Sequence, residues 1–161
     1  MIRPYRPTED RETLWQLKRG FELTLGTATG GPEKGEIYRE KLDAAYRERY
    51  LDWVGECVAA ESCVFLAERE GEACGYAFLL PERLAMIWDA AVLNELYVEP
   101  EARGTGIADD LMAAVIEAAG EQSLPIERIV LDVDADNGRA RAFYDRFGFE
   151  SWGELVTRPL D

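Results

Sequence analysis

The chain has 161 residues, a length that suits one domain built around a single hydrophobic core. Its 18 lysines and arginines oppose 32 aspartates and glutamates, which gives a formal net charge of −14 at pH 7. A field of that sign repels polyphosphate, so we expect neither a nucleic-acid-binding protein nor one that binds anionic membranes. An apolar content of 47% beside 31% charged residues is typical of a folded soluble domain.

The length of the apolar runs, the positions of the cysteines and the absence of histidine further limit the cellular compartment and the chemistry that we expect. No stretch approaches the roughly 20 apolar residues that cross a bilayer, and no signal-peptide core follows Met1, so we expect a cytoplasmic protein. Cys57, Cys63 and Cys74 form no Cys-x-x-Cys pair and lie among apolar residues, which predicts reduced, buried thiols. The chain has no histidine, which excludes Ser-His-Asp triads and histidine-based metal sites, and no metal is expected.

The N-terminal third predicts a short strand followed by a helical pair. Residues 2–5 are typical of a strand, and Thr8 or Asp10 is suited to cap a helix that carries Lys18 beside its apolar residues. Loop chemistry over 26–32 separates this helix from a second, longer periodic stretch. The aromatic and apolar residues of that stretch recur at helical spacing and predict a core face, formed by Tyr38, Leu42, Tyr46, Tyr50, Trp53 and Cys57.

The rest of the chain alternates strands and helices. In chain order we expect a hairpin of strands over 62–68 and 74–80, a strand over 91–98, a helix from 107 to near Gly120, a strand over 128–133, a helix over 139–147 and a closing strand over 149–156. This order predicts a mixed α/β fold with one sheet covered by helices.

The most specific local feature is a glycine-rich turn over 103–108, between a strand that ends at Val98 and a helix. Glycines let backbone amides approach a ligand closely, and amides at a helix start attract phosphate. Ile107 follows Gly106 where a Walker A loop needs Lys-Ser/Thr, and Asp109 stands where a dinucleotide fingerprint needs glycine or alanine, so both motifs are excluded. A turn that merely connects strand and helix is the structural alternative.

Two motifs in this half of the chain resemble those of the GNAT N-acetyltransferase superfamily. Residues 103–108 match its acyl-CoA-binding pattern Arg/Gln-x-x-Gly-x-Gly/Ala. Residues 137–149 match a second family pattern, Asn-x-x-Ala-x-x-Phe-Tyr-x-x-x-Gly-Phe, at the usual distance. The likeness is close over 91–150, whereas residues 6–60, a region that usually shapes the acceptor pocket, match only as two helices.

The resemblance implies a single GNAT-like, acyl-CoA-dependent N-acetyltransferase domain over residues 1–161. Its fold would be a twisted, mostly antiparallel sheet of six to seven strands flanked by helices, with an N-terminal helical pair. Its activity would be direct transfer of an acetyl group from acetyl-CoA to a primary amine in a ternary complex, with a small-molecule acceptor favoured and a homodimer expected. The alternatives are a protein or peptide N-acetyltransferase and a non-catalytic CoA-binding sensor or accessory protein.

The resemblance also implies which residues bind the donor. The implied CoA-binding residues are Leu96, Tyr97, Val98, Arg103, Gly104, Thr105, Gly106, Ile107, Ala108 and Asn137. Asp109 departs from the family pattern, because its carboxylate competes with a pyrophosphate at the same helix end. Arg103, Arg139 and Arg141 are candidates to offset that negative charge.

Two residues are assigned to catalysis on the same basis. Tyr144 stands where the family has a tyrosine that protonates the leaving thiolate, and a phenol pKa of about 10 exceeds a thiol pKa of about 8.5. Glu95 is expected to remove a proton from the amine, directly or through water. Asn94 and Glu95 point to opposite faces of a regular strand, and a bulge there would decide which one faces the site. The structural alternatives are a packed aromatic residue for Tyr144 and a salt-bridged carboxylate for Glu95.

The acceptor side is less specific. Trp53, Trp88 and Asp89 form a candidate pocket in which ring faces and a carboxylate bind a cation, although tryptophan is more often used in the core. The acidic composition fits a cationic acceptor and equally fits a salt-adapted surface.

Overall fold

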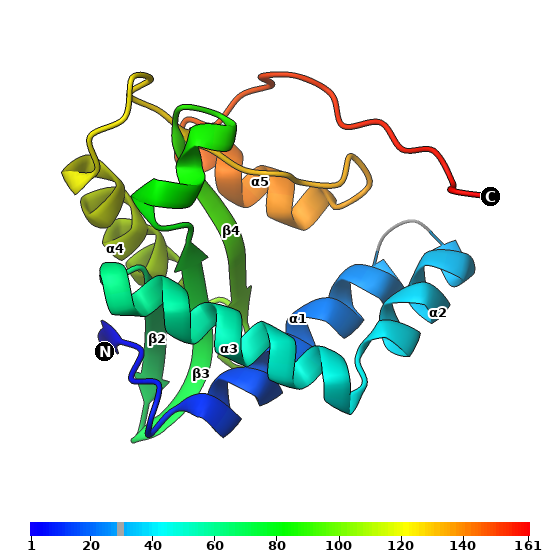
Figure 1. Cartoon of the computed structure of the whole chain (residues 1–161), viewed down its shortest axis with the longest axis horizontal. Coiled ribbons are helices and arrows are strands. Elements are labelled where there is room, and N and C mark those ends of the chain that lie inside the picture. Colours follow the sequence, from blue (N-terminus) through cyan, green and yellow to red (C-terminus); the bar gives the residue numbers. More distant parts are fainter. Residues whose placement is uncertain (29–30) are drawn as a thin grey trace.

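A five-stranded sheet forms the centre of the computed structural model, which describes residues 1–28 and 31–161. The strands are β1 (Ile2–Pro4), β2 (Val64–Arg69), β3 (Glu72–Leu79), β4 (Ala91–Val98) and β5 (Ile129–Val130). Neighbouring strands are antiparallel from β1 to β4, and β5 is parallel to β4. The predicted mixed α/β fold is confirmed, with five strands in the described residues where the resemblance implied six to seven (Figure 1).

Five α-helices and two short 3-10 helices complete the described part of the chain. They are α1 (Arg11–Ala28), α2 (Gly31–Lys41), α3 (Ala44–Ala60), η1 (Glu82–Ile87), η2 (Pro100–Ala102), α4 (Ile107–Glu121) and α5 (Gly138–Arg146). The periodic stretch after α1 was expected to continue as one helix, but Asp43 interrupts it. The Asp43 side chain accepts a hydrogen bond from the Tyr46 amide at 2.8 Å and so caps α3. Three helices therefore precede β2.

The loop expected over 26–32 is shorter than its composition suggested. α1 extends through Ala28 and α2 begins at Gly31, while residues 29–30 lie outside the described residues. The hairpin of β2 and β3 is confirmed, and its turn has φ of 55° at Glu70 and 83° at Gly71. Positive φ at two successive turn residues matches the twist of the flanking strands.

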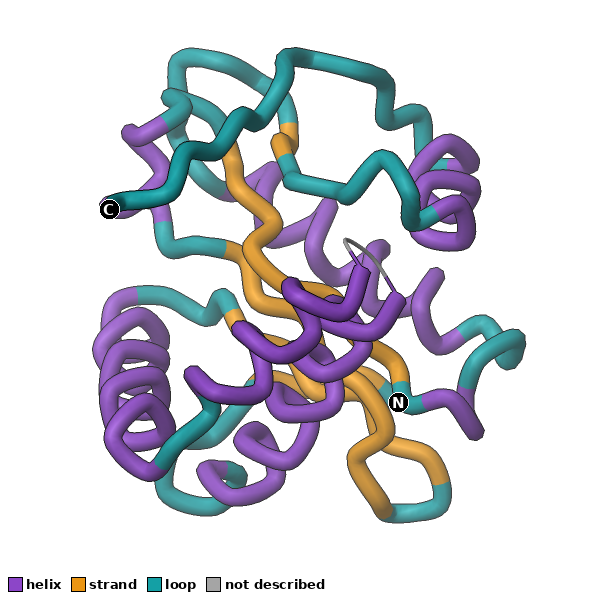
Figure 2. The backbone as a smooth tube through the Cα atoms, turned by 90° about the vertical axis from the view of Figure 1, so that its right-hand side faces the viewer, coloured by secondary structure: helices purple, strands orange, loops and turns teal. Residues whose placement is uncertain are grey.

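The sheet is buried on both faces. On one face Tyr76 and Phe78 of β3 contact Phe21 of α1 and Trp53 of α3, with ring centroids 6.3 and 5.2 Å apart. Neighbouring residues of β3 point to the opposite face, where Leu79 is also fully buried. The helix α4 packs against β2, β3 and β4 through an apolar side, and Figure 2 shows helices on either side of the strands.

The two helices α1 and α2 cross where each has a glycine. A Cβ atom on Gly35 would lie 2.8 Å from the Gly26 carbonyl oxygen, and one on Gly26 would lie 3.0 Å from the Gly35 Cα. This close approach brings the end of α2 against α1, which matters for the site described below. Both contacts involve backbone atoms, which have little room to move away.

We expect Gly35→Ala to lower the free energy of unfolding by about 1–3 kcal/mol, because the added methyl overpacks a backbone contact. Gly55→Ala is the matched control, since nothing lies within 4 Å of a Cβ at that position of α3. There the added methyl should raise stability by about 0.5–1 kcal/mol through helix propensity. Urea denaturation followed by circular dichroism measures both, and equal effects in the two variants would contradict the close packing.

The C-terminal strands are where the sequence prediction is wrong. The strand expected over 128–133 pairs only at Ile129 and Val130, and the closing strand expected over 149–156 is absent from the described structure. Residues 150–161 are exposed and extend away from the sheet (Figure 1). β-rich composition predicts a strand only if a neighbouring edge is available, and β5 pairs for just two residues. None of the described helices is both apolar enough and long enough to traverse a lipid bilayer.

The three cysteines are buried and free, as expected for reduced core thiols. Burial raises the pKa of the Cys63 thiol to about 12, so it remains protonated at neutral pH.

Candidate active site

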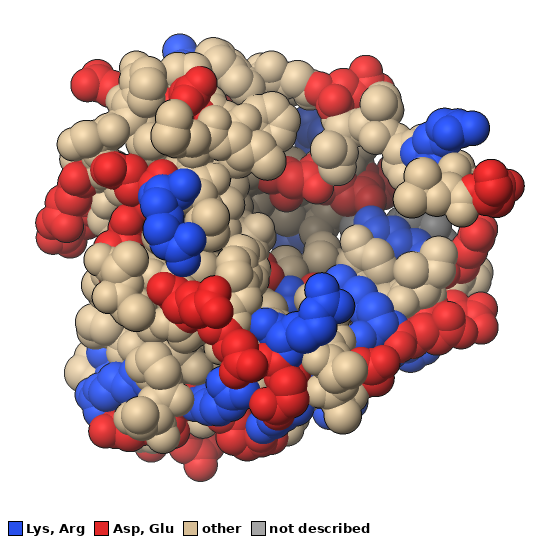
Figure 3. Space-filling model, in the orientation of Figure 1, with Lys and Arg blue, Asp and Glu red and all other residues tan. Residues whose placement is uncertain are grey.

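The two strands β4 and β5 part after two residue pairs. Ala91 pairs with Ile129 and Val92 pairs with Val130, whereas β4 continues to Val98. From Leu93 onward the described residues give β4 no strand partner on this side. Figure 3 shows the molecule deeply hollowed between the part that carries α5 and the part that carries α1 and α2. The diverging strands thus leave room for a ligand beside the exposed backbone of β4.

The predicted glycine turn lies at the end of β4 and leads into α4. Gly104 and Gly106 have φ of 77° and 88°, a conformation that strongly favours glycine. No atom lies within 4 Å of a Cβ placed on either residue, so the turn faces open space. Gly106 is the N-cap of α4, and no side chain accepts a hydrogen bond from the first amides of the helix. These amides, at the positive end of the helix dipole, fit an anionic ligand.

The remaining residues of this segment hold the turn in place. Leu96, Tyr97 and Val98 form the last part of β4, and the Arg103 Nε donates to the Val98 carbonyl at 2.9 Å. The Thr105 hydroxyl donates to the Ala102 carbonyl at 2.5 Å. The turn is therefore braced by its own side chains, while its glycines and the start of α4 stay open.

The charges of two arginines, Arg103 in the turn and Arg139 on α5, are near enough to influence each other. Burial and the nearby charge of Arg103 both lower the pKa of Arg139 on α5. Neither guanidinium forms an ion pair with a carboxylate in the described part of the chain. Mutual repulsion of two cations favours an anion between or beside them. Together with the glycine turn, this arrangement fits the phosphate groups of CoA.

Asp109, the departure from the family pattern, is neutralised by a different arginine from those expected. Its Oδ1 lies 2.9 Å from an Nη of Arg146, at the other end of α5 from Arg139. Both side chains are about half exposed, so the pair lies at the surface. The expectation that Arg103, Arg139 or Arg141 offsets Asp109 is corrected accordingly, and among the described residues no carboxylate is paired with Arg103 or Arg139.

The structure gives Asn137 a role in forming the helix. Its Oδ1 accepts a hydrogen bond from the Ala140 amide at 3.2 Å and so caps α5. The cap sets the start of the helix that carries Tyr144. The ring of Tyr144 is half-buried and packs against Phe143 and Phe149, with centroids 5.3 and 5.5 Å apart.

The hydroxyl of Tyr144 forms no hydrogen bond with another described residue. Burial raises the pKa of this phenol to about 12. The group is therefore a neutral proton donor at physiological pH, with its hydrogen not committed to a protein acceptor.

A bulge decides where Glu95 points. Phe78 lies opposite Glu95 and Leu79 lies opposite Leu93, so Asn94 has no partner on β3. Asn94 is exposed, and Glu95 is 6% exposed on the face covered by α1 and α3. The extra residue thus turns Glu95 toward the interior and leaves Asn94 at the surface.

Both oxygens of Glu95 are held by buried donors. Oε1 accepts from the hydroxyls of Tyr50 at 2.6 Å and Tyr76 at 2.8 Å, and Oε2 accepts from the Lys18 ammonium at 2.7 Å. Lys18 also donates to Glu22 at 2.5 Å. Sequence reasoning missed these three partners of Glu95 and the link from Lys18 to Glu22. The signal that pointed to them was a lysine placed among the apolar residues of the first helix.

The electrostatics of this network keep Lys18 charged. Burial by itself lowers the pKa of Lys18, but the negative charges of Glu95 and Glu22 outweigh it and raise the pKa above its ordinary value. Burial and the charge of Glu95 also raise the pKa of Tyr50 and Tyr76 well above the usual range. Both phenols therefore remain hydrogen-bond donors to the carboxylate.

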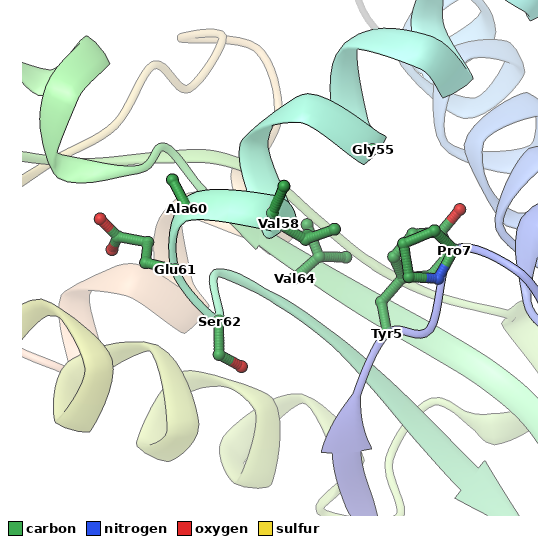
Figure 4. A pocket seen from close by; sticks show the side chains of 9 residues that line it. Tyr5, Pro7, Gly55, Val58, Ala60, Glu61, Ser62 and Val64 are labelled. Carbon is green, nitrogen blue, oxygen red and sulfur yellow. The ribbon is translucent and has the colours of Figure 1, made fainter.

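The expected acceptor pocket of tryptophans is not brought together. Trp53 packs in the core against Phe78, whereas Trp88 is 53% exposed at the end of η1 beside Asp89. A surface pocket of about 360 Å³ lies elsewhere, between the end of α3 and β2 (Figure 4). Its lining residues include Tyr5, and none of them is a predicted site residue.

Comparisons with known proteins place these features in a family. The model of the acetyltransferase (GNAT) family matches residues 31–149. Mycothiol acetyltransferase of Streptomyces griseus is 33% identical over 121 residues, which are 73% of this chain and 34% of that protein. Mycothiol acetyltransferase of Paenarthrobacter aurescens is 32% identical over 165 residues, 99% of this chain and 45% of that protein. The chain thus spans less than half the length of these relatives.

Solved structures agree on the fold. PaiA N-acetyltransferase of Thermoplasma acidophilum, solved in complex with coenzyme A, superposes with a TM-score of 0.70 at 21% identity and covers 93% of this chain and 89% of its own. Ribosomal-protein-alanine N-acetyltransferase of Brucella melitensis superposes with a TM-score of 0.71 at 26% identity and covers 95% and 86% of the two chains. Because the family model matches residues 31–149 and relatives are 32–33% identical over most of the chain, this chain belongs to the acetyltransferase (GNAT) family.

Proposed function

We propose that this chain is an N-acetyltransferase that moves an acetyl group from acetyl-CoA to a primary amine of a small molecule, with residues 1–161 acting as one domain. The observation that carries the proposal is the uncapped start of α4, open at Gly104 and Gly106, with the unpaired Arg103 and Arg139 beside it. The relatives named mycothiol acetyltransferase favour a small-molecule acceptor over a protein.

The donor would lie along β4 and end at α4. We assign its phosphates to the amides of residues 104–108 and to the two arginines, because these groups supply positive potential without bound carboxylates. We assign the adjoining arm to the free backbone edge of Leu96, Tyr97 and Val98, which has no strand partner there. In this arrangement Asn137 acts through α5, whose start it caps.

The acceptor must lose a proton before it can attack. An alkylamine has a pKa near 10.4, so only about one molecule in 10³ is neutral at pH 7. We propose that a water molecule carries this proton from the amine to Glu95. Direct contact with the amine is not expected, because Lys18, Tyr50 and Tyr76 enclose the oxygens of Glu95. The neutral amine nitrogen then bonds to the acetyl carbon, the C–S bond breaks, and the sulfur takes the phenolic proton of Tyr144. The nitrogen releases its second proton to water as the amide forms, and the Tyr144 phenolate regains a proton from water.

Binding of the donor is the first test. We expect acetyl-CoA and desulfo-CoA to bind with micromolar dissociation constants in titration calorimetry, more tightly at low salt than at high salt, and ATP not to bind. Arg139→Gln should weaken acetyl-CoA binding about tenfold, because it removes one cation from the phosphate site. Arg158→Gln, in the exposed C-terminal segment, is the matched control. If no CoA compound binds at either salt concentration, the proposed function is wrong.

A second candidate function is acetylation of a protein or peptide amine. The observation that favours it is the likeness to ribosomal-protein-alanine N-acetyltransferase at 26% identity. A screen of small amines and N-terminal peptides, followed by release of free CoA, separates the two functions. Transfer to peptides alone would exchange the first candidate for the second.

A further inference from the structure

The three lysines of the chain, Lys18, Lys34 and Lys41, all lie on α1 and α2 and all contact an aromatic ring. Lys18 and Lys41 each lie over two rings, and Lys41 is the more exposed of these two lysines. The Lys41 ammonium lies 4.6 Å from the centroid of Tyr38 and 5.4 Å from that of Tyr46. Such distances are those of cation–π contacts, which select for a positively charged group.

The same ammonium is next to a buried carboxylate. Glu22 is 3% exposed, and its Oε1 is held by Lys18 at 2.5 Å. Its Oε2 is buried and accepts no hydrogen bond within the described residues, although the Lys41 Nζ lies 2.9 Å away as an ion pair. The Lys41 side chain is 37% exposed. A buried oxygen is thus satisfied only by the charge of a long side chain that enters from the solvent side.

Charge balance shows what the cluster requires. The buried carboxylates of Glu22 and Glu95 carry two negative charges, and the ammonium groups of Lys18 and Lys41 supply two positive ones. The Lys18 side chain is enclosed between the two carboxylates and is 4% exposed. Moving it away would leave two buried negative charges without their shared ion-pair partner. Lys41 is the exchangeable cation. Its departure would leave one unit of negative charge facing the rings of Tyr38 and Tyr46.

We propose that Glu22 Oε2, Tyr38 and Tyr46 form a binding subsite for the ammonium group of the acceptor, and that Lys41 occupies this subsite until a substrate ammonium displaces it. A primary alkylammonium has the same head group as lysine and restores the same charge balance. Lys18 links the subsite to Glu95 through contacts of 2.5 and 2.7 Å, so an acceptor bound here lies near the carboxylate assigned to receive its proton.

The inference rests on the proposed function only in naming the ligand as the acceptor. The subsite itself is tested by binding, with n-butylammonium as the probe and n-butanol as its uncharged counterpart, both titrated at pH 7 and followed by NMR chemical shifts. Lys41→Met removes the resident ammonium, so we expect it to bind n-butylammonium at least about tenfold more tightly than the parent chain. Binding of n-butanol should stay weak in both proteins.

Three further variants locate the effect. Lys34→Met is the matched control, because Lys34 lies on the same helix and over the same Tyr38 ring but is paired with Asp134. It should leave the affinity unchanged. Lys41→Arg keeps a cation in place and should show no gain. In the Lys41→Met background, Glu22→Gln should abolish the gain, and circular dichroism with thermal melting checks that each variant is folded.

Two results would overturn the subsite. One is a folded Lys41→Met chain that binds n-butylammonium no better than the parent chain, and the other is an equal gain for n-butanol. The outcome is separate from that of the donor titration. A gain in ammonium binding without any CoA binding would support the subsite and refute the proposed acetyltransferase function. CoA binding without a gain in ammonium binding would support the acetyltransferase function and refute the subsite.

Discussion

Replacing Tyr144 with phenylalanine is expected to lower kcat by about 10²–10⁴-fold, the usual contribution of a positioned general acid. The change removes one oxygen and keeps the ring that packs against Phe143 and Phe149. Affinity for acetyl-CoA should therefore change by less than about twofold, because we assign the phosphates of the donor to the glycine turn and not to Tyr144. Steady-state release of CoA and calorimetric titration measure the two quantities.

The pH dependence gives the prediction a sign. Burial raises the pKa of Tyr144 to about 12, so the hydroxyl stays protonated from neutral pH up to about that value. Below a pH of about 11, ionisation of Tyr144 should therefore not lower kcat of the parent enzyme. The alkaline part of its pH profile should match that of the phenylalanine variant. Tyr5→Phe is the matched control, since it removes another buried hydroxyl without a hydrogen-bond partner, far from the turn. A Tyr144→Phe enzyme with full kcat would exclude the proton-donor role.

The two halves of the chain differ in how well their sequence predicts them. The hairpin, β4, the glycine turn and α4 follow from local signals: strand composition, a Glu-Gly turn and two glycines before an apolar periodic stretch. Each signal acts within a few residues, so no knowledge of distant contacts was needed. The local structure of the proposed donor side, a strand, a glycine turn and a helix, could therefore be predicted from the sequence.

The acceptor side could not be predicted, because it depends on contacts between distant segments. Glu95 was a candidate, but its environment comes from Lys18 on α1, Tyr50 on α3 and Tyr76 on β3. The direction of its side chain depends on the register shift opposite Leu79, and no local pattern indicates a bulge of that kind. The pairing of Asp109 with Arg146 likewise joins two residues that are 37 positions apart in the sequence.

Glu95→Gln is the change with the other large expected effect. If Glu95 receives the acceptor proton through water, the amide variant should lose about 10²–10⁴-fold in kcat/KM at pH 7. The amide oxygen can still accept hydrogen bonds from the hydroxyls of Tyr50 and Tyr76, so the site should keep its shape. Lys18 retains Glu22 but loses half of its negative partners, and we expect the free energy of unfolding to fall by about 1–3 kcal/mol.

The pH profile separates proton acceptance from simple loss of structure. In the parent enzyme the carboxylate helps to remove the proton, so kcat/KM should depend less steeply on pH than the neutral fraction of an alkylamine does. In Glu95→Gln no carboxylate accepts the proton, and kcat/KM should follow the fraction of neutral amine up to a pH of about 10.4. Glu101→Gln removes the same charge from an exposed position in η2 and should leave both rate and profile unchanged. A Glu95→Gln enzyme that is less stable but keeps the parent's pH profile would make Glu95 a structural anchor for Lys18, and water or another carboxylate the base.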